Sequence, residues 1–215
     1  MILSTKAKRI YTAISENETK LGDLRKIATE IKKDHELAKE LWSTGKLLPR
    51  LFSILIMDKK ELNPEFIDNL FIDIQQHPPG ERTQLADWLM ANQLTRDKKA
   101  IALIESWENN VSAVKRRIFW YYQGRLRWVG QVPPGNTKKL LSAIEERMLN
   151  EEPEVQWAMN FTAGWIGIFD QAYRKQCIKI GEKTGLYKDE TVAKNCTPNY
   201  LPEFIEMEIK KRNLK

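Results

Sequence analysis

The chain has 215 residues, of which 42% are hydrophobic and 30% charged, and its formal net charge is +6. This composition is typical of a folded globular protein and argues against a disordered chain, and no apolar run approaches the roughly 18 residues that a membrane-spanning helix requires. Two cysteines and two widely separated histidines are too few for a disulfide framework or a metal site, so no metal is expected.

The first residues, MILSTKAKRIYTAIS, place Lys6, Lys8 and Arg9 where an export signal would have its apolar core. This segment is therefore predicted to be a helix. The two cysteines are expected to be free thiols, as is usual for proteins in a reducing compartment. A cytoplasmic location is therefore expected, with association to the nucleoid if the source is bacterial.

Helical periodicity continues along nearly the whole chain, and no segment has a convincing strand pattern. The boundaries are marked by predicted caps and breaks, which are Asp34, Asn63 and Asp170 at helix starts, Pro64 at a first helical position, and Gly45 and Gly185 at helix ends. After the first helix, the predicted helices cover residues 22–33, 35–44, 47–57, 64–74, 81–94, 98–108, 111–129, 137–149, 153–169, 170–185 and 201–212.

Successive helix pairs recur at intervals of about 35–45 residues, which is the spacing of HEAT-type repeats. The sequence therefore predicts an all-α fold, a HEAT-like (ARM-type) right-handed α-solenoid of antiparallel helix pairs. It is expected to form a single domain over residues 1–215, whose inner helices line a concave face.

Positive charge is concentrated in two parts of the chain, residues 1–60 with 13 basic and 8 acidic groups and residues 96–150 with 11 and 5. Such blocks are typical of a patch that attracts a polyanion. The predicted helix at 111–129 contains five cations and no acidic residue, and its second face, opposite the apolar one, carries Arg116, Trp120, Gln123 and Arg127. This face either binds a partner or is a basic face whose tryptophan is covered by the next helix. Gly124 is a point at which the helix could bend.

Several segments carry a resemblance to a known family. LGDLRKIATEIKKDHELAKELWSTG at residues 21–45, the following Pro49-Arg50, and the later VKRRIF and WAMNFTAGWIG segments resemble the AlkD-like DNA alkylation repair family. The resemblance runs from about residue 21 to the C-terminus. The members of that family are HEAT-like DNA glycosylases that remove N-alkylated purines, such as 3-methyladenine and 7-methylguanine. The resemblance therefore implies a HEAT-like fold and an activity of this kind that needs no metal or cofactor.

Glycosylases of this kind need a carboxylate beside the sugar to stabilise the developing oxocarbenium charge, an aromatic ring against the lesion, and arginines at the phosphates. The resemblance places the family's Trp-x-x-x-Asp pair on Trp88 and Asn92, so that the carboxylate position holds a neutral amide. Asp87 is no substitute, because it lies about 140° around the helix from Asn92. The family's basic-helix arginine falls on Arg116, its second tryptophan on Phe161 and its second arginine on Gly164.

We therefore expect a member of this family that binds duplex DNA, alkylated or distorted, on a basic concave face, with excision weakened or lost. The alternatives are an active monofunctional glycosylase, in which Asn92 orients water, and a non-catalytic interaction scaffold. A monomer is expected. The predicted site residues are Trp88 and Asn92 as the catalytic pair, Trp88 and Phe161 at the lesion, and Lys115, Arg116, Arg117, Trp120 and Arg127 at the DNA. Trp157 and Trp165 are predicted to point away from Phe161, and Trp42 and Trp107 to pack in the core.

Overall fold

The computed structural model describes residues 3–15, 19–131, 133–194 and 196–214. Met1 and Ile2 of the predicted first helix, and Val132 of the predicted break after the basic helix, lie outside these ranges. The described residues form twelve α-helices and four short 3₁₀ helices, without a strand among them. The chain divides into two compact units, Met1–Ser106 and Trp107–Lys215, so the expectation of one domain stays a prediction.

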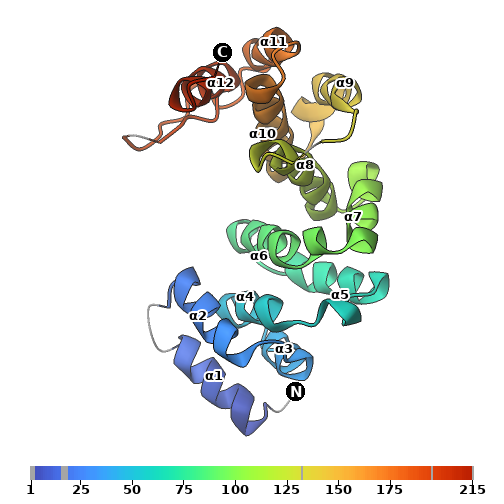
Figure 1. Cartoon of the computed structure of the whole chain (residues 1–215), viewed down its shortest axis with the longest axis vertical. Coiled ribbons are helices and arrows are strands. Elements are labelled where there is room, and N and C mark those ends of the chain that lie inside the picture. The colour runs from blue at the N-terminus through green and yellow to red at the C-terminus, as the bar shows by residue number, and fades with distance from the viewer. Residues whose placement is uncertain (1–2, 16–18, 132, 195, 215) are drawn as a thin grey trace. The chain divides into compact units, whose positions relative to one another are not determined.

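The described residues of the first unit form seven α-helices in two layers (Figure 1). Along the chain α2, α4 and α6 pack one on the next, α1 packs on α3, and α3 and α4 form a hairpin. Contacts between helices that are two apart in the chain, together with the α3–α4 and α5–α6 neighbours, are the contact pattern of stacked helix pairs. The bounds are α1 (Thr5–Ser15), α2 (Leu21–Ile31), α3 (His35–Trp42), α4 (Leu47–Ile56), α5 (Pro64–Gln75), α6 (Pro79–Asn92) and α7 (Lys98–Glu105).

Local sequence accounts for the helix starts in this unit. The Asp34 side chain accepts a hydrogen bond from the Leu37 N–H at 3.1 Å, and the Asn63 side chain accepts one from the Phe66 N–H at 2.9 Å. Each side chain satisfies an amide that the first helical turn leaves without a partner. The caps predicted at these two positions are therefore confirmed.

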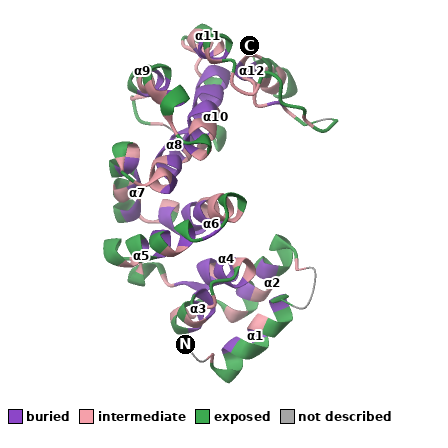
Figure 2. Ribbon diagram, turned by 180° about the vertical axis from the view of Figure 1, so that it is seen from behind, coloured by how far each residue is buried: buried purple, intermediate pink, exposed green. Residues whose placement is uncertain are grey.

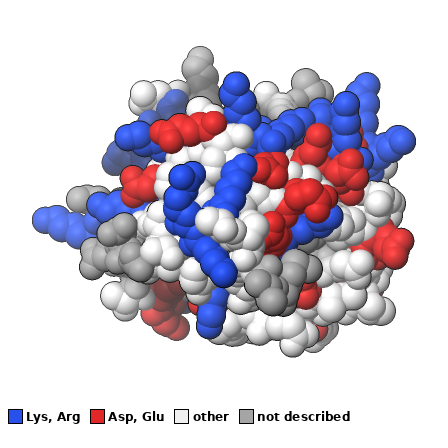
Figure 3. All heavy atoms as spheres, turned by 90° about the horizontal axis from the view of Figure 1, so that it is seen from below, with Lys and Arg blue, Asp and Glu red and all other residues white. Residues whose placement is uncertain are grey.

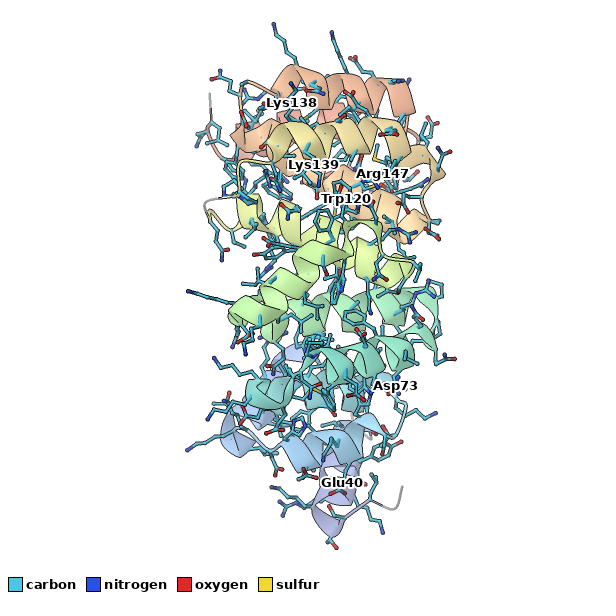
Figure 4. All side chains as sticks on the ribbon, turned by 90° about the vertical axis from the view of Figure 1, so that its right-hand side faces the viewer. Glu40, Asp73, Trp120, Lys138, Lys139 and Arg147 are labelled. Atoms are coloured by element: carbon cyan, nitrogen blue, oxygen red, sulfur yellow. The ribbon has the colours of Figure 1, made fainter. Side chains whose placement is uncertain are left out.

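A buried arginine connects the helices of the first unit. Arg50, on α4, donates to the carbonyls of Trp42 at 3.2 Å and Asp73 at 2.9 Å and to Nε2 of His77 at 2.8 Å. Because the guanidinium only donates, His77 Nε2 is the acceptor and its Nδ1 carries the proton, which is directed to Glu81 at 2.7 Å. Burial lowers the pKa of Arg50, although the nearby Asp73, labelled in Figure 4, acts in the opposite direction.

The second unit is built on α8, which packs along α10, and on α12, which packs against α10 and α11. Figure 2 shows that α8 and α10 are buried over much of their length. The helix predicted to start at a capping Asp170 begins later, at Arg174, because Asp170 ends α10 and a turn follows. The bounds are α8 (Ala113–Trp128), α9 (Thr137–Arg147), α10 (Pro153–Phe169), α11 (Arg174–Thr184) and α12 (Leu201–Lys211).

Gly124 brings α8 and α10 close together. The helix runs through this position from Ala113 to Trp128, and a Cβ on Gly124 would lie 2.6 Å from the ring of Phe161. The missing side chain therefore makes room for Phe161 between two helices that pack closely.

Candidate nucleic-acid interface

Trp88 and Asn92 lie one turn apart at the end of α6. The Trp88 indole donates to the carbonyl of Leu51 on α4 at 3.0 Å, which fixes the ring against the neighbouring helix. Asn92 is 8% exposed, and its amide donates to the Trp88 carbonyl at 2.8 Å. The two side chains project to the same region, as residues four apart on a helix do.

Arg25, on α2, completes this group, and sequence reasoning did not single it out. Its Nη1 lies 3.3 Å from Oδ1 of Asn92, and its Cζ lies 4.3 Å from the centre of the Trp88 ring. A guanidinium at this distance has a favourable cation–π interaction with the indole. A cation belonging to the protein therefore occupies a face of Trp88 and contacts the Asn92 amide.

These residues lie beside a pocket of about 550 Å³ formed by α2, the end of α4 with the 3₁₀ helix Lys59–Glu61, and the end of α6 with the 3₁₀ helix Leu94–Arg96. None of its lining residues is acidic. Lys33 pairs with Asp58 at 3.2 Å, at the edge of the pocket. The cations that line the pocket are Arg25, Lys32, Lys33, Lys59 and Arg96.

The charge of this pocket decides what it can hold. The positive charge of these side chains opposes an N-alkylated base, which is itself a cation, and opposes the oxocarbenium charge that develops when its bond to the sugar breaks. The same potential attracts an oxyanion such as a phosphate.

The second face of the basic helix α8 is buried, which differs from the prediction that it faces DNA. Trp120 is fully buried at 0% exposure, and Arg147 of α9 lies over its ring with Cζ 5.9 Å from the ring centre. Figure 4 shows Trp120 and Arg147 side by side. The alternative in which the next helix covers the tryptophan is the correct one, so Trp120 forms part of the packing between α8 and α9.

Arg127 and Gln123 belong to the same buried face. Arg127 donates to the Gln123 carbonyl at 2.9 Å and to Oγ1 of Thr137 at 3.1 Å, and the Gln123 side chain accepts from Asn136 at 3.1 Å. Burial lowers the pKa of Arg127, with opposing effects from Asp170 and the Cys177 thiol. This arginine holds the start of α9 against α8.

The other cations of α8 have partners within the second unit. Arg116 is paired with Glu151, at 2.9 Å, and with Glu152. Burial lowers the pKa of Arg116, but the hydrogen bonds and charges of these two carboxylates raise it overall. Arg117 donates to the Glu154 carbonyl at 2.9 Å, and Lys115 lies 5.5 Å from the centre of the Trp107 ring. The DNA contacts assigned to these residues stay predictions.

Phe161 lies in a row of aromatic rings along α10, which we call the aromatic ladder and which consists of Trp157, Phe161, Trp165 and Phe169. Ring centres are 5.2 Å apart from Trp157 to Phe161 and 5.9 Å apart from Phe161 to Trp165. The prediction that Trp157 and Trp165 point away from Phe161 is wrong, because a step of four residues turns a helix by only about 40°. The ladder was visible in the sequence as an aromatic residue at every fourth position.

Gly164 of α10 lies directly against the last helix. A Cβ at Gly164 would lie 2.6 Å from the ring of Phe204 on α12. The space that a side chain would need is filled by the last helix, so this position serves packing. Trp42 and Trp107, at 6% and 2% exposure, also pack in the core, as predicted.

Charge is mixed over other parts of the surface. Figure 3 shows Lys and Arg side chains interspersed with Asp and Glu on one face of the molecule. Within the described ranges, no three His, Cys, Asp or Glu side chains come together to hold a metal ion. No described helix is both long and apolar enough to cross a membrane.

The protein is therefore an all-helical repeat protein built of stacked helix pairs. Its candidate site is a cationic pocket, which suits an anion. A family model described as "DNA alkylation repair enzyme" matches residues 19–182, and the chain belongs to that family. The fold is similar to a solved structure described as "A new family of proteins related to the HEAT-like repeat DNA glycosylases with affinity for branched DNA structures". The TM-score is 0.70 and the identity 20%, over 98% of this chain and 90% of that one. The predicted all-α, HEAT-like fold is therefore confirmed. A search of curated proteins finds no match.

Proposed function

We propose that this protein is a DNA-binding member of the DNA alkylation repair enzyme family that does not excise N-alkylpurines efficiently. The observation that carries the proposal is the group formed by Trp88, Asn92 and Arg25. The carboxylate position holds an amide, and the guanidinium of Arg25 lies over the ring that would stack on the lesion.

Two effects act together at this group. Without a carboxylate, the transition state loses a charge-stabilising interaction, which is typically worth about 3–4 kcal/mol. Arg25 then adds a like charge near the place where the cationic base and the developing sugar cation would lie. Both effects weaken excision, and neither weakens binding to the DNA backbone.

DNA binding is supported by the cationic pocket and by the similarity of fold. The solved structure that resembles this chain over nearly its full length belongs, by its description, to a family with affinity for branched DNA. We infer that this protein likewise binds duplex DNA that is branched or distorted, through the layer of α2, α4 and α6. It acts as a monomer, without metal or cofactor, in the cytoplasm where the DNA lies.

The proposal is tested by incubating the protein with methylated duplex DNA and measuring the 3-methyladenine and 7-methylguanine released. The wild-type protein is expected to release no more than the spontaneous background. Asn92→Asp alone is expected to stay inactive, because Arg25 would pair with the new carboxylate. Asn92→Asp combined with Arg25→Ala restores the carboxylate and uncovers Trp88, so this double variant is the one expected to gain activity.

Efficient release of either base by the wild-type protein would overturn the proposal and favour the active glycosylase. Arg25→Ala alone serves as the matched control, since it uncovers Trp88 without supplying a carboxylate. A wild-type protein that fails to bind duplex DNA at low salt would instead favour the interaction scaffold.

A further inference from the structure

The pocket beside Trp88 carries more positive charge than its surroundings neutralise. Of its five cationic side chains, Lys33 has an ion pair, with Asp58. Arg25 donates to the neutral amide of Asn92, and no carboxylate among the described residues pairs with Lys59 or Arg96. Cations gathered this closely repel one another, so the folded protein gains free energy when an anion binds between them.

The base of the pocket is polar and held in place. Asn92 and Gln93 are each 8% exposed, whereas the cationic side chains around them are exposed. The Gln93 amide donates to the carbonyls of Ile54 at 2.5 Å and Met57 at 3.3 Å, which ties the end of α6 to the end of α4. A fixed polar base under adaptable cationic side chains suits a compact oxyanion, and a volume of about 550 Å³ lies within the range of roughly 300–1,000 Å³ found for small-ligand sites.

Lys32 adds an observation that is independent of the charge count. It ends α2 with φ 63° and ψ −141°, a backbone conformation that glycine adopts at less cost than a residue with a side chain. The chain therefore has a lysine where the backbone alone would favour glycine. The side chain retained at this cost lines the pocket.

We propose that this pocket binds a phosphate group of a nucleic-acid strand. Arg25 and Arg96 provide guanidinium groups that match phosphate oxygens, and the lysines add charge. The inference rests on the proposed function, because it names the part of the DNA that enters the site. The phosphate comes either from a strand end, where it carries nearly two negative charges, or from within the strand, where it carries one.

The test uses the full chain and two labelled duplexes that are identical except for a 5′-phosphate or a 5′-hydroxyl at one strand end. Fluorescence anisotropy at low salt measures the affinity for each duplex, and calorimetry measures binding of inorganic phosphate. Arg25→Ala and Arg96→Ala are each expected to weaken binding to the duplexes and to inorganic phosphate by about tenfold. Lys8→Ala and Lys98→Ala, which remove exposed cations of the same unit outside the pocket, are expected to change the affinities by less than about twofold.

The two sources of phosphate give different results, and either result supports the pocket. A strand-end phosphate predicts tighter binding of the 5′-phosphorylated duplex, and this preference fades at about pH 5 because the second pKa of such a phosphate is about 6. An internal phosphate predicts equal affinity for the two duplexes at both pH values, with equal losses in the two arginine variants.

Lys32→Gly separates binding from folding. Relief of the backbone conformation is expected to raise the melting temperature, while loss of the cation weakens phosphate binding, so the two readouts move in opposite directions. Pocket variants that bind duplex and phosphate as tightly as the Lys8 and Lys98 controls would overturn the inference and leave the proposed function standing. A protein that binds inorganic phosphate but neither duplex would overturn both the nucleic-acid assignment and the proposed function.

Discussion

Arg25 changes the chemistry of the candidate site more than any other single side chain. A neutral Asn92 alone would leave a polar site able to orient water, but the guanidinium beside it makes the site cationic. The substrate and the transition state of alkylpurine excision are both cations. The positive charge of Arg25 therefore repels both of them. This is why restoring the carboxylate alone is expected to fail.

The two cysteines are predicted to differ in reactivity. Burial raises the pKa of the Cys177 thiol to about 12, whereas Cys196 is exposed. Because thiol reagents attack the thiolate, we expect Ellman's reagent at about pH 8 to modify one thiol quickly and the second only after unfolding. Two equally fast thiols in the folded protein would contradict this.

The same raised pKa gives a dependence of stability on pH. A group that holds its proton more tightly in the folded state stabilises that state fully below its unfolded pKa, here 9.0, and this contribution is lost as pH rises toward 12. Urea unfolding at increasing pH should therefore show a smaller loss of stability above about pH 9 in Cys177→Ala than in the wild-type protein.

At the scale of the helix, close approach in the second unit depends on residues without side chains. Gly124 and Gly164 each face an aromatic ring at a distance that leaves no room for a Cβ. We expect Gly164→Arg to destabilise the protein by about 1–3 kcal/mol through overpacking against Phe204. The free energy of unfolding in urea measures this effect.

Gly22→Ala is the matched control for this substitution. Gly22 lies on α2, and no neighbouring atom lies within 4 Å of the position that a Cβ would take there. Alanine at this position should therefore leave the stability unchanged or raise it by up to about 1 kcal/mol. An unchanged unfolding midpoint in Gly164→Arg would mean that α12 does not pack on α10 in solution.

Arg50 is predicted to be the most important single polar residue for the packing of the first unit. Arg50→Met would remove the donor to the Trp42 and Asp73 carbonyls and to His77, and leave these buried acceptors without it. We expect a loss of about 2–4 kcal/mol in the free energy of unfolding. Lys39→Met, which removes an exposed ion pair with Glu36, is the control and should leave the midpoint nearly unchanged. Equal midpoints for the two variants would contradict this role.

For the whole molecule, the distribution of charge predicts how DNA binding responds to salt. Each phosphate that the protein neutralises should contribute about −0.9 to the slope of the logarithm of the binding constant against the logarithm of salt concentration. Loss of the one phosphate contact proposed for the pocket, in Arg25→Ala, should therefore make the slope less negative by about 1. Anisotropy titrations at several salt concentrations measure the slope. A binding constant indifferent to salt would rule out backbone contacts as the source of affinity.

The sequence predicted the helices and two of their caps because these depend on residues close together in the chain. Asp34 and Asn63 act on amides three residues away, so their roles follow from local order. Trp88 and Asn92 share one helix, and their common direction follows from the helical repeat. Asp170 failed as a cap because the chain inserts a turn there, which local order did not reveal.

By itself, the sequence determined the helical fold and the family, since each depends on residue type and spacing along the chain. The tertiary structure alone decided which faces are covered. Arg25 reaches Asn92 across 67 residues, and α9 closes over Trp120. Helical periodicity says which side chains share a face, but the helix that packs on that face is chosen by contacts distant in the chain. The cationic pocket and the buried arginines of α8 are therefore properties of the packed helices.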